Sequence, residues 1–270
     1  MAFLRVTVVV LFATLVSGCI NSGTLVKVKP DGSGTIEQTL LVNAAALKGL
    51  MSGIGGATGE VKDTGGVLNE AEFKRSAERI GARPVSLTPL KEGGFEGAKA
   101  LYAFDDITKI RVDQDPQLAG SSAGTPSKPP SSKNPIKFAF ARQGANSVLT
   151  ITVDEQITAP GSKPAEGAKP SIEKMDPAML QMVKTMFQGF KVLIDLEVDG
   201  KIIKTNADYV NGSRVTLLEL DMATLFENEA ALTALQSKVG PGASIAEVRP
   251  YLKDIKGVKI NDPNLTIEFR

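Results

Sequence analysis

The sequence contains no histidine and no tryptophan, and it contains only one cysteine. The lack of histidine removes the most common general base, the Ser-His-Asp triad and most zinc sites. A single cysteine cannot form a disulfide within the chain. Aromatic residues are scarce at 5%, which disfavours a carbohydrate-binding surface built on stacked rings. We therefore expect no enzyme activity, no cofactor and no metal site.

An excess of charge of either sign is also absent. The 31 lysines and arginines nearly balance the 30 aspartates and glutamates. Proteins that bind nucleic acid carry a basic excess that neutralises phosphates, so we expect no nucleic-acid partner. The apolar run at 6–16 has eleven residues, which is fewer than the ~20 that a membrane-spanning helix needs.

This apolar run is part of a start that is typical of a bacterial lipoprotein. Arg5 supplies one positive charge, and the run ends in Leu15-Val16-Ser17-Gly18-Cys19, with small residues before the only cysteine. A positive start, a short apolar run and small residues at the cut are typical of a secretory signal peptide. In chains with such a lipobox the leader is removed before the cysteine, whose thiol is diacylated and whose new amine is acylated. Two or more acyl chains hold a protein stably on a bilayer.

These residues predict a signal peptide at 1–18 and lipidation of Cys19. The alternative is an ordinary secretory leader with a cysteine at its end by chance, but no cysteine occurs in the 251 residues that follow. The predicted partner is a membrane, contacted through the acyl chains on Cys19, and the predicted location is the bacterial cell envelope. An aspartate after the cysteine would favour the inner membrane. Ile20 at that position indicates the periplasmic face of the outer membrane in a Gram-negative host.

Residues 19–270 are expected to form a single domain with flexible segments. Stretches rich in glycine, serine, threonine and proline predict such segments at about 53–66, 111–135 and 159–170. The segment 111–135 is flanked by strand-like sequence. It is either a loop inserted within a sheet or a linker between domains, and the sequence leaves both open.

Several stretches have the composition of strands or helices. Residues 24–42 predict a hairpin around the turn Pro30-Asp31-Gly32-Ser33-Gly34. A helix is predicted from Asn69 to Gly81, because Phe73, Ala77 and Ile80 form one apolar stripe at helical spacing. Shorter strands are predicted at 85–88, 98–104, 136–141, 147–153 and 265–269, and further helices at 227–239 and 244–252.

Residues 190–220 predict a three-stranded antiparallel meander. Apolar residues alternate with polar ones along 190–198, and two-residue turns, Asp199-Gly200 and Asn211-Gly212, separate this strand from strands at 201–205 and 213–220. The fold class expected from these elements is α+β. It consists of an antiparallel β-sheet, made of hairpins and this meander, with helices packed on one face.

Residues 171–187 predict a helix that carries a methionine stripe. Four methionines at spacings of 4, 3 and 4 lie on one face of such a helix. This helix either packs on the sheet as core, or its unbranched, polarizable methionines line a site for lipid tails opposite the strand 190–198. The candidate ligand-lining residues are Met175, Met179, Met182, Met186, Phe190, Val192 and Ile194.

Four short motifs follow one another in the predicted meander. They are Phe190-Lys191-Val192, Asp199-Gly200-Lys201-Ile202-Ile203, Thr205-Asn206-Ala207 and Asn211-Gly212-Ser213-Arg214-Val215-Thr216. With the lipobox and the first hairpin, they resemble the LppM-type lipoprotein domain family, in which a proline often stands at the position of Asp199. The resemblance implies an α+β domain with an antiparallel sheet, helices against it and membrane tethering. It transfers no binding residue to this chain.

Two functions are compatible with these features. The first is a membrane-tethered, non-enzymatic domain that binds a lipid or another amphiphile in an apolar groove. The alternative is an envelope scaffold or protein-interaction lipoprotein with a closed core, whose partner is another envelope protein. An apolar cavity beside the methionine helix favours the first function, and a filled interior favours the second.

Overall fold

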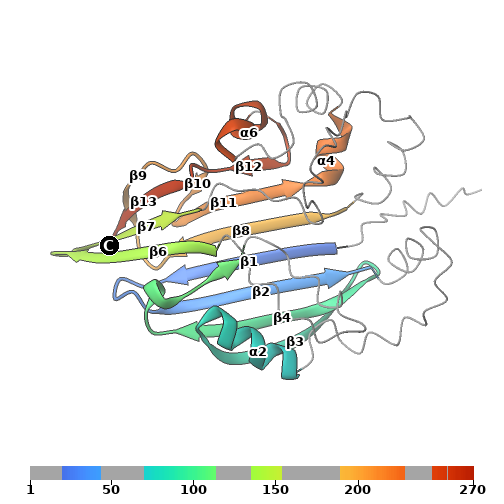
Figure 1. The fold of residues 1–270 in the computed structure, drawn as a ribbon, viewed down its shortest axis with the longest axis horizontal. Coiled ribbons are helices and arrows are strands. Elements are labelled where there is room, and N and C mark those ends of the chain that lie inside the picture. The colour runs from blue at the N-terminus through green and yellow to red at the C-terminus, as the bar shows by residue number, and fades with distance from the viewer. Residues whose placement is uncertain (1–19, 44–69, 114–134, 154–188, 229–244, 254) are drawn as a thin grey trace, which may run out of the picture.

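The fold is that of a computed structural model, which describes residues 20–43, 70–113, 135–153, 189–228, 245–253 and 255–270. Two β-sheets make up most of it (Figure 1). The larger sheet has eight strands, which are β1 (Ile20–Val28), β2 (Gly34–Val42), β3 (Arg83–Glu92), β4 (Phe95–Phe104), β8 (Lys191–Val198), β10 (Val210–Asn211), β11 (Arg214–Asp221) and β12 (Val258–Ile260). The smaller sheet has five, which are β5 (Val112–Asp113), β6 (Pro135–Gln143), β7 (Asn146–Thr152), β9 (Ile202–Thr205) and β13 (Asn264–Phe269).

The strand order of the larger sheet is β10-β11-β8-β1-β2-β4-β3, with β12 paired to β11. All its pairs are antiparallel except β1 with β8, which run parallel from Asn21↔Lys191 to Val28↔Val198. The smaller sheet has the order β5-β6-β7-β13-β9 and is antiparallel throughout. β1 therefore lies at the centre of the larger sheet, between β2 and β8.

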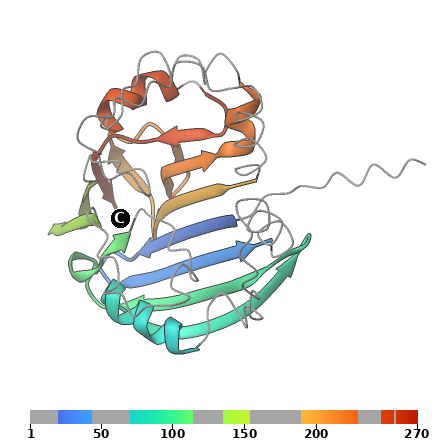
Figure 2. The ribbon, with the colours of Figure 1, turned by 45° about the vertical axis from the view of Figure 1, so that its right-hand side comes forward.

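The predicted α+β fold with helices on one face is wrong. Within the described residues, the α-helices are only α2 (Glu70–Ile80), α4 (Met222–Glu227) and α6 (Ile245–Leu252), with a 3-10 turn η1 (Ile107–Lys109). They form no layer, because α2 lies near β3 and β4 at one edge of the larger sheet, while α4 and α6 lie near β11 and β12 at the opposite edge (Figure 2). The apolar face of a sheet can be buried by helices or by a second sheet. Here the smaller sheet buries much of it.

The predicted three-stranded meander is also wrong. β8 pairs with β11 on one edge and with β1 on the other, so no edge of β8 is left for the next strand in the chain. After the turn at Asp199-Gly200 the chain crosses to the smaller sheet, where β9 pairs with β13. Reciprocal backbone hydrogen bonds between Lys201 and Arg270, of 2.8 and 3.1 Å, hold the crossing.

Other predicted elements are confirmed. β1 and β2 form the first hairpin, with Val26 opposite Ile36, and β6 and β7 form a second one. Helix α2 buries its predicted stripe of Phe73, Ala77 and Ile80. The strands β3, β4 and β13 and the helix α6 also lie where the sequence predicts them. Helix α4 and the short strands β5, β10 and β12 were not predicted. The predicted helix at 171–187, nearly all of the one at 227–239 and the predicted flexible segments 53–66 and 159–170 lie outside the described residues.

The two ends of the segment 111–135 pair with each other. Val112 lies opposite Ile136, and Asp113 lies opposite Pro135, so β5 and β6 are neighbours in the smaller sheet. Of the two possibilities left open by the sequence, this pairing agrees with a loop inserted within a sheet.

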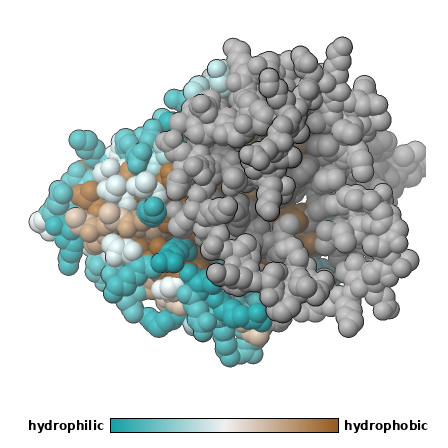
Figure 3. Space-filling view, in the orientation of Figure 1, coloured by the Kyte–Doolittle hydropathy of each residue, from teal (hydrophilic) through white to brown (hydrophobic). Residues whose placement is uncertain are grey.

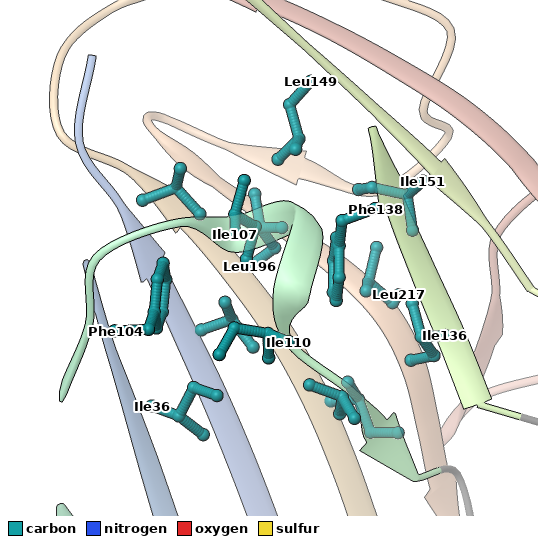
Figure 4. Close-up of a cluster of buried hydrophobic side chains, with 14 of the residues drawn as sticks. Ile36, Phe104, Ile107, Ile110, Ile136, Phe138, Leu149, Ile151, Leu196 and Leu217 are labelled. Carbon is teal, nitrogen blue, oxygen red and sulfur yellow. The ribbon is translucent and has the colours of Figure 1, made fainter. Parts of the chain in front are cut away.

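The main core lies between the two sheets. Figure 4 shows side chains from η1, β6, β7, β8 and β11 that point toward one another. Ile36 and Leu196 of the larger sheet and Leu149 and Ile267 of the smaller sheet are fully buried. Alternation along each strand explains this, because every second residue faces the opposite sheet. At the end of the molecule where β6 and β7 lie, hydrophilic side chains surround the hydrophobic ones (Figure 3).

Candidate functional site

Only part of the predicted ligand-lining set lies within the described residues. Cys19 and the methionines Met175, Met179, Met182 and Met186 lie outside them. Phe190 precedes β8 and is half-buried, whereas Val192 and Ile194 on β8 are 6% and 3% exposed. These three residues follow one another at intervals of two, so their side chains occupy one face of the chain. That face is turned toward the main core.

A small apolar cleft lies where this face meets the smaller sheet. Its volume is about 30 Å³. Of the predicted ligand-lining residues that the structure describes, Ile194 alone lies in its wall. Among the described residues, the lining comes from both sheets and from the loop between β12 and β13, and it consists of Ile136, Val153, Ile194, Leu217, Leu218, Ile260, Asn261, Asp262, Pro263 and Leu265. Figure 4 shows two of these residues, Ile136 and Leu217, between the sheets.

A β-bulge in β11 places two consecutive leucines in the cleft wall. The register of β11 against β8 shifts between Thr216 and Leu218. Regular alternation sends neighbouring side chains to opposite faces, and a bulge changes this locally. Leu217 and Leu218 therefore both line the cleft. The sequence contains no signal of this bulge, because Leu217 and Leu218 also fit a regular strand.

Polar residues hold the rim of the cleft. Asn261 is 4% exposed, and its side-chain amide donates to the Thr216 carbonyl at 2.7 Å. Its side-chain oxygen accepts from the backbone N–H of Asp208, also at 2.7 Å. Asp262 accepts from the Arg249 guanidinium at 2.9 Å. These bonds connect α6, the loop after β9 and the loop before β13, so the rim is positioned by three separate segments.

Arg249 is the centre of this rim network. It donates to Asp262 and also to Asp208, on two different loops. Burial disfavours its charge, but the hydrogen bonds and charges of Asp208 and Asp262 outweigh burial and raise the pKa of Arg249 above its usual value. The guanidinium therefore stays charged at every physiological pH, and its role at the rim is to hold the two loops together.

A second apolar feature lies at the end of the larger sheet where β1 begins. Ile20 and Leu40 are buried together, and the half-buried Val42 and Phe190 pack against them. We call these four residues the terminal cluster. Ile20 pairs with Val42, and Asn21 pairs with Lys191, which follows Phe190. Phe190 thus belongs to the terminal cluster as well as to the edge of the main core.

The opposite face of the larger sheet is polar. Glu197 of β8 accepts from Arg214 of β11 at 2.6 and 3.1 Å, and it pairs with Lys27 of β1 at 3.3 Å. The hydrogen bond from Arg214 lowers the pKa of Glu197, and Lys27 adds to this. Similar ion pairs join β2 with β4 and β12 with β11. In the described part of the chain, no group of three or more acidic or cysteine side chains is placed to hold a metal ion.

The sheets, the cleft and the terminal cluster together define the kind of protein that this chain is. The chain is a mostly β protein of two packed sheets, with a small apolar cleft between them and a terminal cluster at the start of its first strand. No helix among the described residues has the length and apolar character needed to cross a membrane.

Comparison with known proteins adds one similar structure. No protein-family model matches the chain, and no curated protein matches it. The NMR structure of the LppM folded domain from Mycobacterium tuberculosis is similar at a TM-score of 0.36 and 12% identity, over 94% of this chain and 90% of that chain. A similarity of this size assigns neither a family nor a function to the chain.

Proposed function

We propose that the chain is a bacterial envelope lipoprotein, tethered through acyl chains on Cys19, whose two-sheet domain binds an amphiphile without enzymatic activity. It needs no cofactor, and its partner besides the membrane is a lipid. In a Gram-negative host its place is the periplasmic face of the outer membrane. The lipobox supports the tether, and the apolar cleft supports the binding activity.

The observation that carries the binding proposal is the position of the cleft on β8. Ile194 lines the cleft, and Val192 and Phe190 continue the same apolar face toward the terminal cluster. Four residues of strand span about 13 Å. Val192 is buried in the main core, so an alkyl chain that follows this stripe from the terminal cluster to the cleft must displace the side chains packed on it. Ligand sites are mostly apolar with a few oriented polar groups, as the lining with Asn261 and Asp262 is here.

The test fills the cleft from within. Ile194→Phe adds volume at the centre of the lining, and Ile203→Phe makes the same change at a side chain that is 43% exposed. The full chain is produced in a lipidating bacterium, and native mass spectrometry measures the phospholipid that it retains without a covalent bond. We expect Ile194→Phe to lower this amount roughly tenfold, as a loss of about 1.4 kcal/mol would.

The matched control separates binding from folding. Ile203→Phe should retain as much phospholipid as the wild type, and thermal unfolding should show both variants folded. If Ile194→Phe does not fold, Leu218→Phe fills the same cleft from β11. Wild-type protein that carries no phospholipid at all, or a cleft-filling variant that retains the full amount, contradicts the binding proposal.

A second candidate function is an envelope scaffold or protein-interaction lipoprotein with a closed core. The volume of the cleft favours it, because about 30 Å³ is well below the roughly 300–1,000 Å³ of typical ligand sites. Crosslinking in cells followed by pull-down tests this candidate. A specific envelope protein crosslinked to the chain, together with no retained phospholipid, would favour it over amphiphile binding.

A further inference from the structure

We infer that the end of the larger sheet at which β1 begins faces the lipid bilayer, so that the domain is held on the membrane in one orientation. This inference rests on the proposed acylation of Cys19. It goes further by stating which surface meets the lipid. The surface contacts a phospholipid bilayer. We infer this partner because β1 begins directly after Cys19, the proposed site of acylation.

The first step is the distance between the anchor and the fold. Ile20 is the first residue of β1 and follows Cys19 directly in the chain. Consecutive Cα atoms are about 3.8 Å apart, so no flexible linker separates the acylated residue from the sheet. Ile20 is 9% exposed and paired with Val42. A free tether would let the domain rotate, whereas a strand that begins next to the anchor holds its own end at the headgroups.

The second step is to identify what else lies at this end. Ile20 pairs with Val42, Val42 pairs with Glu96, and Lys191 pairs with both Asn21 and Asp221. These pairs place the start of β1, the end of β2, the start of β4, the start of β8 and the end of β11 at one end of the sheet, on the right in Figure 1. We call this the membrane-proximal end. The amide of Met222, the first residue of α4, donates to the Phe190 carbonyl at 3.0 Å and adds the start of α4 to it.

The third step is the opposite end, which the same geometry places far from lipid. β1 has nine residues, and its eight steps span about 26 Å. The turn after β1 is held by η1, since the Ile107 amide donates to the Gly32 carbonyl at 2.9 Å. Lys109 ends η1 with a side chain that is 78% exposed. We call this the distal end.

The chemistry of the membrane-proximal end fits an interface with headgroups. The half-buried Val42 and Phe190 of the terminal cluster supply apolar surface at the strand ends. Two ion pairs lie near them, Lys91 with Glu96 at 2.9 Å and Lys191 with Asp221 at 3.9 Å. These pairs give no basic excess, so we attribute the orientation to the covalent anchor and not to attraction to anionic lipid.

The test uses the absence of tryptophan from the chain. Single tryptophans are introduced as Phe190→Trp and Glu96→Trp at the membrane-proximal end and as Lys109→Trp at the distal end. Each acylated full-length variant is reconstituted into phosphatidylcholine vesicles, with and without a nitroxide on a fraction of the headgroups. With the ends about 26 Å apart, we expect quenching of Phe190→Trp and Glu96→Trp to exceed that of Lys109→Trp at least about twofold.

The possible outcomes distinguish a failure of the proposed orientation from a failure of the proposed acylation of Cys19. Intact mass first establishes whether Cys19 is acylated, and an unmodified thiol contradicts both proposals. Where Cys19 is acylated, quenching of Lys109→Trp that equals or exceeds the others overturns the orientation alone. Glu96 is exposed, with 59% of its side chain accessible, so Glu96→Trp carries the test if Phe190→Trp does not fold.

Discussion

At the scale of single residues, two carboxylates on β8 have different environments on the polar face of the larger sheet. Asp195 is 5% exposed, and its Oδ1 has no hydrogen-bond partner within the described part of the chain. Its other oxygen lies 3.7 Å from Arg214. Glu197, two residues on, is more exposed and receives two hydrogen bonds from the same arginine. Arg214 therefore contacts both the buried Asp195 side chain and the more exposed Glu197 side chain.

The Glu197 ion pairs predict a pH dependence of stability. The hydrogen bond from Arg214 lowers the pKa of Glu197 below its ordinary value of 4.5. A carboxylate whose pKa is lowered in the folded state stabilises the fold at pH values above its unfolded-state pKa. This contribution decreases below the unfolded-state pKa and is lost as the pH falls through the folded-state pKa. Because the group is partly exposed, we expect the contribution to be about 0.5–1 kcal/mol. Denaturant unfolding of wild type and Glu197→Gln at pH 6 and pH 3 measures it.

The expected result is a smaller loss of stability between pH 6 and pH 3 in Glu197→Gln than in the wild type. Glu78→Gln, on the exposed face of α2, is the control and should lose as much as the wild type. An unchanged pH dependence in Glu197→Gln would mean that solvent screens the pair completely.

Asn206 shows how one side chain extends a strand pairing. Its amide nitrogen donates to the Asn264 carbonyl at 2.9 Å, and its amide oxygen accepts from the Thr266 backbone N–H at 2.7 Å. Both bonds go to β13, the strand that β9 already pairs with. Asn206 belongs to the Thr205-Asn206-Ala207 motif of the predicted meander. Within this fold it supports the crossing of β9 into the smaller sheet.

At the scale of elements, the end of α2 follows from local sequence. The Ala82 amide donates to the Ala77 carbonyl at 2.9 Å and the Gly81 amide to the Glu78 carbonyl at 3.2 Å, which is the pattern of a Schellman motif. The motif needs a residue with positive φ after the helix, and Gly81 has a φ of 80°. The glycine also leaves room for the Lys109 carbonyl, which would lie 2.8 Å from a Cβ at this position.

This geometry predicts the effect of adding one methyl group. Gly81→Ala is expected to destabilise the protein by more than Gly144→Ala. Both positions have positive φ, which costs an L-residue about 1–2 kcal/mol. A Cβ added at Gly144 would meet no other atom within 4 Å, whereas one added at Gly81 would face the Lys109 carbonyl. Denaturant midpoints of the two variants measure the difference, and equal midpoints would contradict the close contact.

The edge strand β3 is protected by its composition. Its side chains are mostly exposed, and it contains Pro84 and Pro89. Proline has no N–H to offer to another strand, and it is common on sheet edges for that reason. A register shift between Pro84 and Ser86 further interrupts the strand. These features disfavour edge-to-edge association of two copies through β3.

At the scale of the whole molecule, one core joins the two sheets. The main cluster includes Leu196 from the larger sheet and Ile267 from the smaller sheet, both fully buried. We expect Leu196→Ala and Ile267→Ala each to cost about 2–5 kcal/mol. Because the two side chains share a core, each variant should shift one common thermal transition seen by circular dichroism.

The control for this prediction is a valine on the surface. Val85 is 54% exposed, and Val85→Ala should change stability by no more than about 0.5 kcal/mol. Two separate transitions, with Ile267→Ala lowering only one of them, would show instead that the sheets unfold independently.

The local elements were predictable because their signals lie in neighbouring residues. The first hairpin depends on a turn and alternation within 24–42, and α2 depends on a stripe of three apolar residues and a terminal glycine. The candidate site was only partly predictable. Alternation along 190–198 predicted that Val192 and Ile194 share one face, and in the structure both are buried. The rest of the cleft comes from strands distant in sequence and from a bulge that has no sequence signature.

The sequence by itself determined where the longer strands and the hairpin turns fall, and that disulfides within the chain are excluded. The structure added that the first strand begins at Ile20, directly after the only cysteine. Tertiary structure alone decided that β8 pairs with β1 in parallel, that β9 leaves the predicted meander and that a sheet and not a helical layer covers the core. The physical reason is that alternation marks which face of a strand is buried and is the same for every partner strand. The choice of partner depends on how all the apolar faces are buried together.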